Sequence, residues 1–207
     1  QREVGAVEWG GALWADLDGD GVEEAVAGTL DNGVAAFDAA GNPRWHFRRA
    51  PPEPPLHIDG PLSACDADGD GRLEIFGTSQ RGPFCLEHDG TPRWETATGD
   101  EFLGGPVVVY ADVDQHPELF AVSRNDNFLW CLDARDGKIR WRAPLLGTPE
   151  AYSASALAAG DLNRNAYERP LMRYEPGPFA EVVAGDGNGH LQAFTFNGFL
   201  RWTFTTK

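Results

Sequence analysis

The hydrophobic and polar positions along the chain form many short segments and no long helical pattern. Apolar runs rich in small and β-branched residues stand between turns that contain Gly, Pro, Asn or Asp. Such runs are typical of β-strands. In the first part of the chain they predict strands at 12–15, 24–28, 34–38 and 44–48. No segment keeps an apolar period of about 3.6 residues, so the sequence predicts an all-β protein.

This strand pattern occurs four times. Each copy ends in Gly-x-x-Arg-Trp, at 41–45, 90–94, 137–141 and 198–202, and each contains an acidic loop, beginning at Asp16, Asp66, Asp112 and Asp161. Four strands in roughly 48 residues is the size of one blade of a β-propeller. We therefore predict a single β-propeller domain over 1–207 with four four-stranded blades, at approximately 11–50, 61–98, 104–145 and 153–207.

The four blades could be arranged in three ways. A closed four-bladed ring is favoured, because an open arc would expose two large apolar blade faces. Two chains could instead complete an eight-bladed ring as a homodimer, or the four blades could be one arc of a larger propeller.

Charge narrows the range of partners. The chain has 207 residues, with 32 Asp and Glu against 17 Lys and Arg, and a net charge of −15. A phosphate backbone would be repelled, which argues against nucleic-acid binding. No apolar run approaches the roughly 20 residues of a spanning helix, so direct membrane insertion is not expected.

Two of the acidic loops have the composition of a Ca²⁺ site. Carboxylates stand at positions 1, 3, 5 and 9 of both loops, and such a density of oxygen donors suits Ca²⁺. The residue at position 7 would contribute its backbone carbonyl. The expected ligands are Asp16, Asp18, Asp20, Val22 and Glu24 in the first loop, and Asp66, Asp68, Asp70, Arg72 and Glu74 in the second. The alternative is a solvated acidic turn without an ion.

The other two loops depart from this pattern. The third, at 112–118, reads as two residues shorter, with His116 in place of the third Asp, and is expected to bind no Ca²⁺. The fourth keeps oxygen donors at Asp161, Asn163 and Asn165, but an insertion within 166–179 displaces the closing acid to Glu181. This loop is a third, weaker candidate for Ca²⁺, since fewer charges bind the ion more weakly.

The acidic loops resemble the FG-GAP/VCBS repeats of Ca²⁺-bearing β-propellers. The stretch 132–141, which ends in Arg140-Trp141, also resembles the tryptophan-docking repeat of pyrroloquinoline-quinone-type propellers. These resemblances imply structural Ca²⁺ ions, an extracellular or periplasmic location, and tryptophans that pack between adjacent blades. By this resemblance Trp45, Trp94, Trp141 and Trp202 are structural residues.

Two functions fit these observations. The favoured one is a non-catalytic, calcium-stabilised scaffold that binds a protein or a glycan. Its expected contact residues are Arg169, Met172, Arg173 and Tyr174 in the insertion, together with Trp130, which lies outside the repeated tryptophan pattern. The alternative is a propeller-type polysaccharide lyase or hydrolase, which would need a catalytic cluster that the sequence does not display.

Overall fold

The computed structural model describes residues 7–29, 33–48, 58, 60–102, 104–112, 114, 116–147, 157–161 and 180–206. Within these residues the regular structure consists of strands, β1 to β16, as the apolar pattern predicts. A helix of the length and apolar character needed to cross a membrane is absent from this described part of the chain.

The strands form four antiparallel sheets, each with its four strands in chain order. We call these sheets blades 1 to 4. Blade 1 contains β1 (Val7–Ala15), β2 (Glu24–Thr29), β3 (Gly33–Phe37) and β4 (Pro43–Arg48). Blade 2 contains β5 (Ser63–Cys65), β6 (Glu74–Ser79), β7 (Gly82–Leu86) and β8 (Pro92–Glu95). Blade 3 contains β9 (Val107–Val109), β10 (Glu118–Val122), β11 (Phe128–Asp133) and β12 (Ile139–Pro144). Blade 4 contains β13 (Leu157–Gly160), β14 (Glu181–Gly185), β15 (His190–Phe194) and β16 (Leu200–Thr205).

The glycine of each Gly-x-x-Arg-Trp segment makes the turn into the last strand of its blade. Gly41, Gly90, Gly137 and Gly198 have positive φ angles of 79°, 83°, 71° and 85°. Residues with a Cβ rarely adopt this backbone conformation, so the turn favours glycine. In each turn the glycine N–H donates to the carbonyl oxygen of the residue that opens the turn, at 2.8 to 2.9 Å.

Apolar side chains are buried between successive blades rather than in one central core. Three clusters lie between blades 1 and 2, 2 and 3, and 3 and 4. Each cluster contains side chains from both of its blades, for example Val34 and Phe84, Cys85 and Leu119, and Leu129 and Val182. Each blade therefore needs a neighbour to bury its faces, which is the expected behaviour of a repeat architecture.

Three of the repeated tryptophans join one blade to the next, which confirms their predicted structural role. The indole N–H of Trp45 donates to the carbonyl of His88 at 3.0 Å, that of Trp94 to Ala134 at 2.9 Å, and that of Trp141 to Phe196 at 2.9 Å. Each indole also lies on the turn glycine of the following blade. A Cβ built on Gly90, Gly137 or Gly198 would lie 2.5 to 2.9 Å from the indole, so only glycine fits there.

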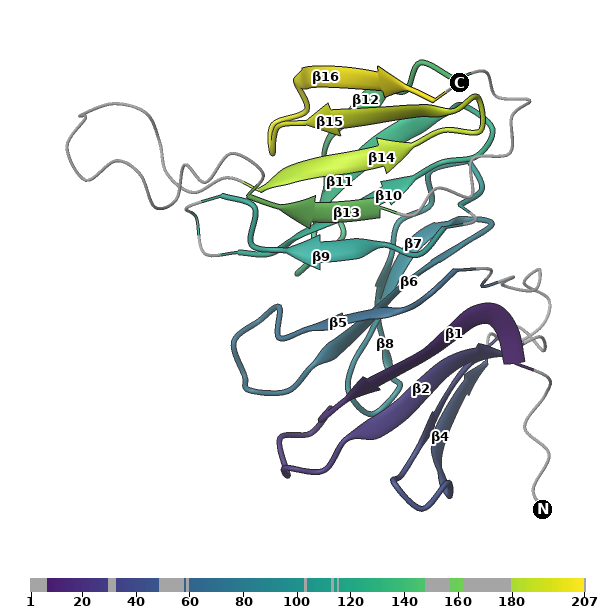
Figure 1. Cartoon of the computed structure of the whole chain (residues 1–207). Helices are drawn as coiled ribbons and strands as arrows, with labels where there is room; N and C mark the ends of the chain where they lie inside the picture. The colour runs from purple at the N-terminus through teal and green to yellow at the C-terminus, as the bar shows by residue number, and fades with distance from the viewer. Residues whose placement is uncertain are drawn as a thin grey trace.

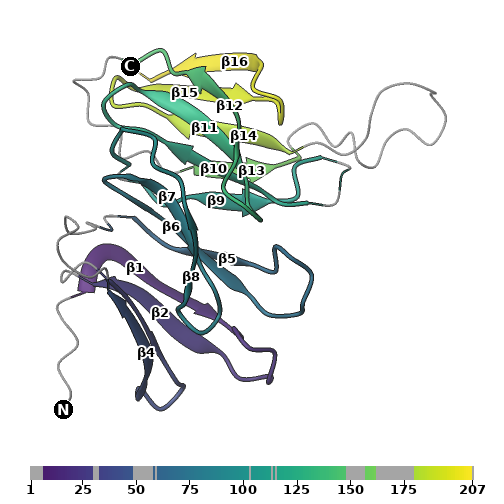
Figure 2. The same cartoon turned by 180° about the vertical axis from the view of Figure 1, so that it is seen from behind.

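The four blades form an open arc, so the favoured closed four-bladed ring is wrong. In both Figure 1 and Figure 2 blades 1 and 4 lie at opposite ends of the molecule, with blades 2 and 3 between them. Contacts between first strands join β1 to β5, β5 to β9 and β9 to β13. Burial of apolar faces therefore did not enforce closure of the ring within the part of the chain that the structure describes.

Candidate functional site

The acidic loops connect the first and second strands of their blades, and a buried glutamate closes each loop. Glu24, Glu74 and Glu118 open the second strands and are at most 2% exposed. The carboxylate of each accepts a hydrogen bond from the backbone N–H seven residues earlier, in Leu17, Ala67 and Ala111, at 2.7 to 3.1 Å. This recurring bond fixes the shape of the loop from its strand end.

The third loop has the same length as the first two, which corrects the sequence alignment. The closing glutamate pairs with Ala15 in blade 1, Cys65 in blade 2 and Val109 in blade 3. Tyr110 therefore occupies position 1, and Asp112 and Asp114 are equivalent to the acids at positions 3 and 5. The Asp-x-Asp spacing allows a shift of two residues, and only strand pairing reveals it.

The first aspartate of loops one and two folds its own loop. Asp16 accepts hydrogen bonds from the backbone N–H groups of Gly19, Asp20 and Gly21 at 2.9 to 3.1 Å. Asp66 repeats this arrangement with Gly69 and Gly71 at 2.7 and 3.0 Å. In loop three, the tyrosine at this position instead donates its hydroxyl to the carbonyl of Asp66 in the preceding blade, at 3.1 Å.

The arginine of Gly-x-x-Arg-Trp reaches from the outer strand to the acids of its own blade. Arg44 lies 2.7 Å from Asp18 and 2.5 Å from Glu24. Arg93 lies 2.8 Å from Asp68 and 3.9 Å from Glu74. Both arginines join the acid at position 3 to the closing glutamate. The fixed position of this arginine before each tryptophan was the signal in the sequence for this role.

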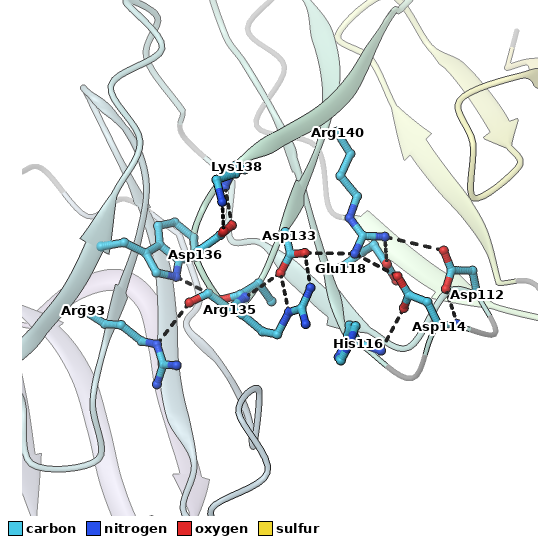
Figure 3. A network of polar contacts seen from close by, with 12 residues as sticks. Arg93, Asp112, Asp114, His116, Glu118, Asp133, Arg135, Asp136, Lys138 and Arg140 are labelled. Carbon is cyan, nitrogen blue, oxygen red and sulfur yellow. Dashed lines mark hydrogen bonds and ion pairs between the residues drawn. The ribbon is translucent and has the colours of Figure 1, made fainter.

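The arginine of blade 3 is the centre of the largest of these networks (Figure 3). Arg140 contacts Glu118 and lies 3.5, 3.1 and 3.0 Å from Asp112, Asp114 and Asp133. In blade 4, Arg201 contacts Glu181 in the same manner. These guanidinium groups supply positive charge beside the acids at which the sequence pattern predicted a metal ion.

The electrostatics of the loops differ between exposed and buried acids. A hydrogen bond from Arg44 holds the pKa of Asp18 below its ordinary value. Burial instead raises the pKa of Glu74 and of Glu118 to about 7, because removal from water disfavours the charged carboxylate. Additional positive charge near such a buried carboxyl would stabilise its ionised form.

Carboxylate oxygens in three loops lie close enough together to hold a cation. The groups are Asp16, Asp18 and Glu24; Asp66, Asp68 and Asp70; and Asp112, Asp114 and Glu118, with ligand atoms within 4.8 Å of one another in each group. Asp18 Oδ1 and Glu74 Oε1 are buried and accept no hydrogen bond from the described residues. The carboxylate oxygens of loops one and two are therefore compatible with Ca²⁺. The arginines leave Asp18 Oδ1 and Glu74 Oε1 without a hydrogen bond, so these oxygens could still bind a cation.

The side chains at position 7 lie at the rim of this region. Val22 is 47% exposed, and the Arg72 guanidinium lies 3.3 Å from His88 Nε2. A cavity of about 310 Å³ between blades 1 and 2 is lined by Asp18, Glu24, Arg44, Trp45, Arg72 and His88. The first acidic loop and the second blade therefore lie on either side of this cavity.

The remaining predicted site residues fall into two groups. Asn163, Asn165, Arg169, Met172, Arg173 and Tyr174 lie outside the described residues. Trp130, in contrast, is 5% exposed and packs against Phe102, with its indole N–H donated to Ser123 Oγ at 2.9 Å. The structure gives Trp130 a packing role rather than an exposed contact surface.

Comparison with known proteins adds a family match to this geometry. The family model described as outer membrane protein assembly factor BamB matches residues 30–206, which include all four Gly-x-x-Arg-Trp segments. None of the curated proteins matches the chain.

Among solved structures, BamB from Moraxella catarrhalis is similar at 15% identity and a TM-score of 0.53, over 94% of this chain and 50% of that chain. BBS1N in complex with ARL6DN is similar at 14% identity and a TM-score of 0.57, over 98% of this chain and 67% of that one. The quinohemoprotein alcohol dehydrogenase from Comamonas testosteroni is similar at 12% identity and a TM-score of 0.63, over 97% of this chain and 36% of that chain. At these identities the likeness shows the propeller fold alone, and the chain spans about half the length of the BamB structure.

Proposed function

This chain belongs to the family of the outer membrane protein assembly factor BamB, and from that premise we propose that it is a non-catalytic scaffold that binds a protein partner outside the cytoplasm. The family's description refers to assembly of outer membrane proteins, and this supports an extracytoplasmic location. BBS1N, a second propeller of similar shape, forms a complex with a protein partner, ARL6DN.

The observation that carries the scaffold proposal is how the charged side chains of the repeats are used. Arg44, Arg93 and Arg140 each join acids of one loop to the outer strand of the same blade. A lyase or hydrolase would need such charged groups directed at a substrate. Here they hold strands together, so the repeats act as a frame for the loops.

We place the contact surface on the insertion 166–179, because its mixture of aromatic, Met, Arg and Pro residues suits a protein interface. A photo-crosslinking amino acid at Met172 should capture a discrete protein when the chain is incubated with an outer-membrane extract. The same group at Lys138, whose side chain is 82% exposed, is the matched control.

Crosslinking from the Lys138 position but not from the insertion would contradict the contact assignment. Release of unsaturated or reducing sugar from a polysaccharide panel would contradict the non-catalytic assignment. The glycan-binding form of the hypothesis predicts retention on a glycan array without turnover.

We further propose that Ca²⁺ stabilises the scaffold at loops one and two. Asp16, Asp18 and Glu24 would hold the ion in blade 1, and Asp66, Asp68 and Asp70 in blade 2. When bound, the ion would supply positive charge that links the loop to the strand behind it. The fit rests on the unpartnered Asp18 Oδ1, a buried oxygen that a cation would satisfy.

Native mass spectrometry before and after EDTA tests this proposal. We expect two bound Ca²⁺ ions and a lower melting temperature after their removal, since an ion that binds only the folded state stabilises it by mass action. Asp18→Asn with Asp68→Asn should remove both ions and the EDTA effect. A metal-free chain with an unchanged melting temperature would show that the arginines alone neutralise the loops.

A further inference from the structure

The acidic loops of neighbouring blades are joined to one another through their backbones. The N–H of Leu73, at position 8 of loop two, donates a hydrogen bond of 3.0 Å to the carbonyl of Leu17, at position 2 of loop one. The same bond occurs between blades 3 and 4, where the N–H of Ala180 donates to the carbonyl of Ala111 at 3.3 Å. Leu73 and Ala180 each precede the closing glutamate of their loop, so this contact is a repeated feature of the fold.

The boundary between blades 2 and 3 uses a side chain for the same purpose. Position 8 of loop three is Pro117, and proline has no backbone N–H to donate. The hydroxyl of Tyr110 instead donates to the carbonyl of Asp66 at 3.1 Å, which links loop three to loop two. The acidic loops are therefore connected across each of the three boundaries between the described blades.

Loops one and two lie directly against each other at their boundary. A Cβ built on Gly19 of loop one would lie 3.3 Å from the carbonyl oxygen of Gly71 in loop two. The cavity between these blades is lined by Asp18 and Glu24 of loop one together with Arg72, at position 7 of loop two. Residues expected to bind one ion are thus neighbours of residues expected to bind the other.

A single peptide group carries both the link and an expected Ca²⁺ ligand. The peptide bond between Arg72 and Leu73 contains the Arg72 carbonyl, which would bind the ion of loop two, and the Leu73 N–H, which donates to Leu17. An ion on that carbonyl would polarise the peptide group and strengthen its N–H as a donor, since hydrogen bonds in a chain polarise one another. The Leu17 carbonyl belongs in turn to the peptide bond that precedes Asp18, an expected ligand in loop one.

Each of the two loops retains a buried oxygen for a cation. Asp18 Oδ1 in loop one and Glu74 Oε1 in loop two have no hydrogen-bond partner among the described residues. Glu74 is fully buried and directly follows Leu73, whose N–H forms the link. In loop one, Leu17 is held from both sides, because its own N–H donates to Glu24 Oε2 at 3.1 Å while its carbonyl accepts from Leu73. Ordering one loop around an ion therefore restrains the backbone of the other.

We propose that loops one and two bind Ca²⁺ as a coupled pair, in which an ion in one loop raises the affinity of the other loop. This inference rests on the Ca²⁺ sites proposed above and adds how the two sites regulate each other. The first ion orders backbone that both loops share, so the second ion meets a loop that has already lost conformational freedom. Repulsion between the two ions opposes this coupling, and salt at 0.15 M, with a screening length of about 8 Å, weakens that repulsion.

Isothermal titration calorimetry with Ca²⁺ at 0.15 M salt tests the coupling. Asp68→Asn leaves loop one to bind alone, and Asp18→Asn leaves loop two. We expect the product of the two association constants of the native chain to exceed the product of the constants of the two variants by ~5-fold or more. In Asp68→Asn, Ca²⁺ should also slow hydrogen exchange at the Leu73 amide, because an ordered loop one holds the Leu17 carbonyl in place.

Leu73→Pro isolates the link, because it removes the N–H as Pro117 does in loop three. Its titration should fit two independent sites. Leu73→Ala is the matched control, since it shortens the same side chain but keeps the N–H, and it should retain the coupling. Tyr110→Phe removes the link on the other side of loop two and should leave the coupling between loops one and two unchanged. The single-site variants and the hydrogen exchange of Leu73 decide the matter if Leu73→Pro does not fold.

Three results would overturn the inference in different ways. Two ions that bind independently to the native chain would refute the coupling and leave the Ca²⁺ sites in place. Coupling that survives in Leu73→Pro would show that the bond to Leu17 does not carry it. Binding of fewer than two ions to the native chain would refute the Ca²⁺ proposal itself, and this inference with it.

Discussion

Substitution of Gly137 by alanine measures how tightly the tryptophan contact holds two blades together. A Cβ at this position would lie 2.5 Å from Trp94 Cε3 and 2.6 Å from Thr96 Oγ1. The indole would have to move, and with it the hydrogen bond of 2.9 Å to the carbonyl of Ala134, which is fully buried. The substitution therefore acts on the interface between blades 2 and 3 and not only on its own turn.

The expected destabilisation has two parts. Placing a Cβ at a φ of +71° costs about 1–2 kcal/mol. Losing the partner of a buried carbonyl adds about 1–3 kcal/mol. Gly99 is the matched control, because its φ is +78° and a Cβ there would meet nothing within 4 Å. Gly99→Ala should cost only the first part.

Equilibrium urea unfolding gives both free energies from the shift of the midpoint at constant slope. We expect Gly137→Ala to be the less stable variant by about 1–3 kcal/mol, the value of the unpartnered carbonyl. Equal losses for the two variants would refute the claim that the indole is held in place by this contact. Backbone strain alone would then account for both losses.

Two further predictions follow from groups outside the loops. The hydrogen bond from Arg135 holds the pKa of Asp133 well below its usual range. The stability that this ion pair contributes is therefore present above the unfolded pKa of about 4 and is lost as pH falls below that value. The difference in unfolding free energy between the native chain and Asp133→Asn, measured by urea unfolding, should narrow below pH ~4, and a constant difference would contradict the ion pair. Cys85 and Cys131 are buried while Cys65 is half-buried, and although burial raises the pKa of all three thiols, a thiol reagent at neutral pH should reach and label Cys65 faster than either of the other two. Equal rates would contradict this burial.

Features that repeat within each blade could be predicted from the sequence. The strand number and the turn glycines depend on residues close together in the chain, and the same local pattern occurs four times; the docking of Trp45, Trp94 and Trp141 joins residues 40 to 55 positions apart and was implied by the family resemblance. Short-range hydrogen bonds and strand alternation then decide the structure. The family match likewise supports the tryptophan-docking resemblance, while the FG-GAP/VCBS resemblance and its Ca²⁺ ions stay predictions.

The register of the third loop and the role of the arginines required the tertiary structure. Asp112 can be aligned with position 1 or position 3 until the pairing of Val109 with Glu118 selects one. Arg140 meets Asp112 across 28 residues of chain, a contact that no local pattern specifies.

Ring closure also depended on tertiary structure, for a different physical reason. Each blade needs a neighbour to bury its apolar faces, and the sequence specifies that need in every repeat. The angle between blades is set by the packing of side chains such as Phe84 and Trp94 in the interfaces. Small rotations add up over four blades, and their sum leaves β4 of blade 1 and β16 of blade 4 at opposite ends of the arc.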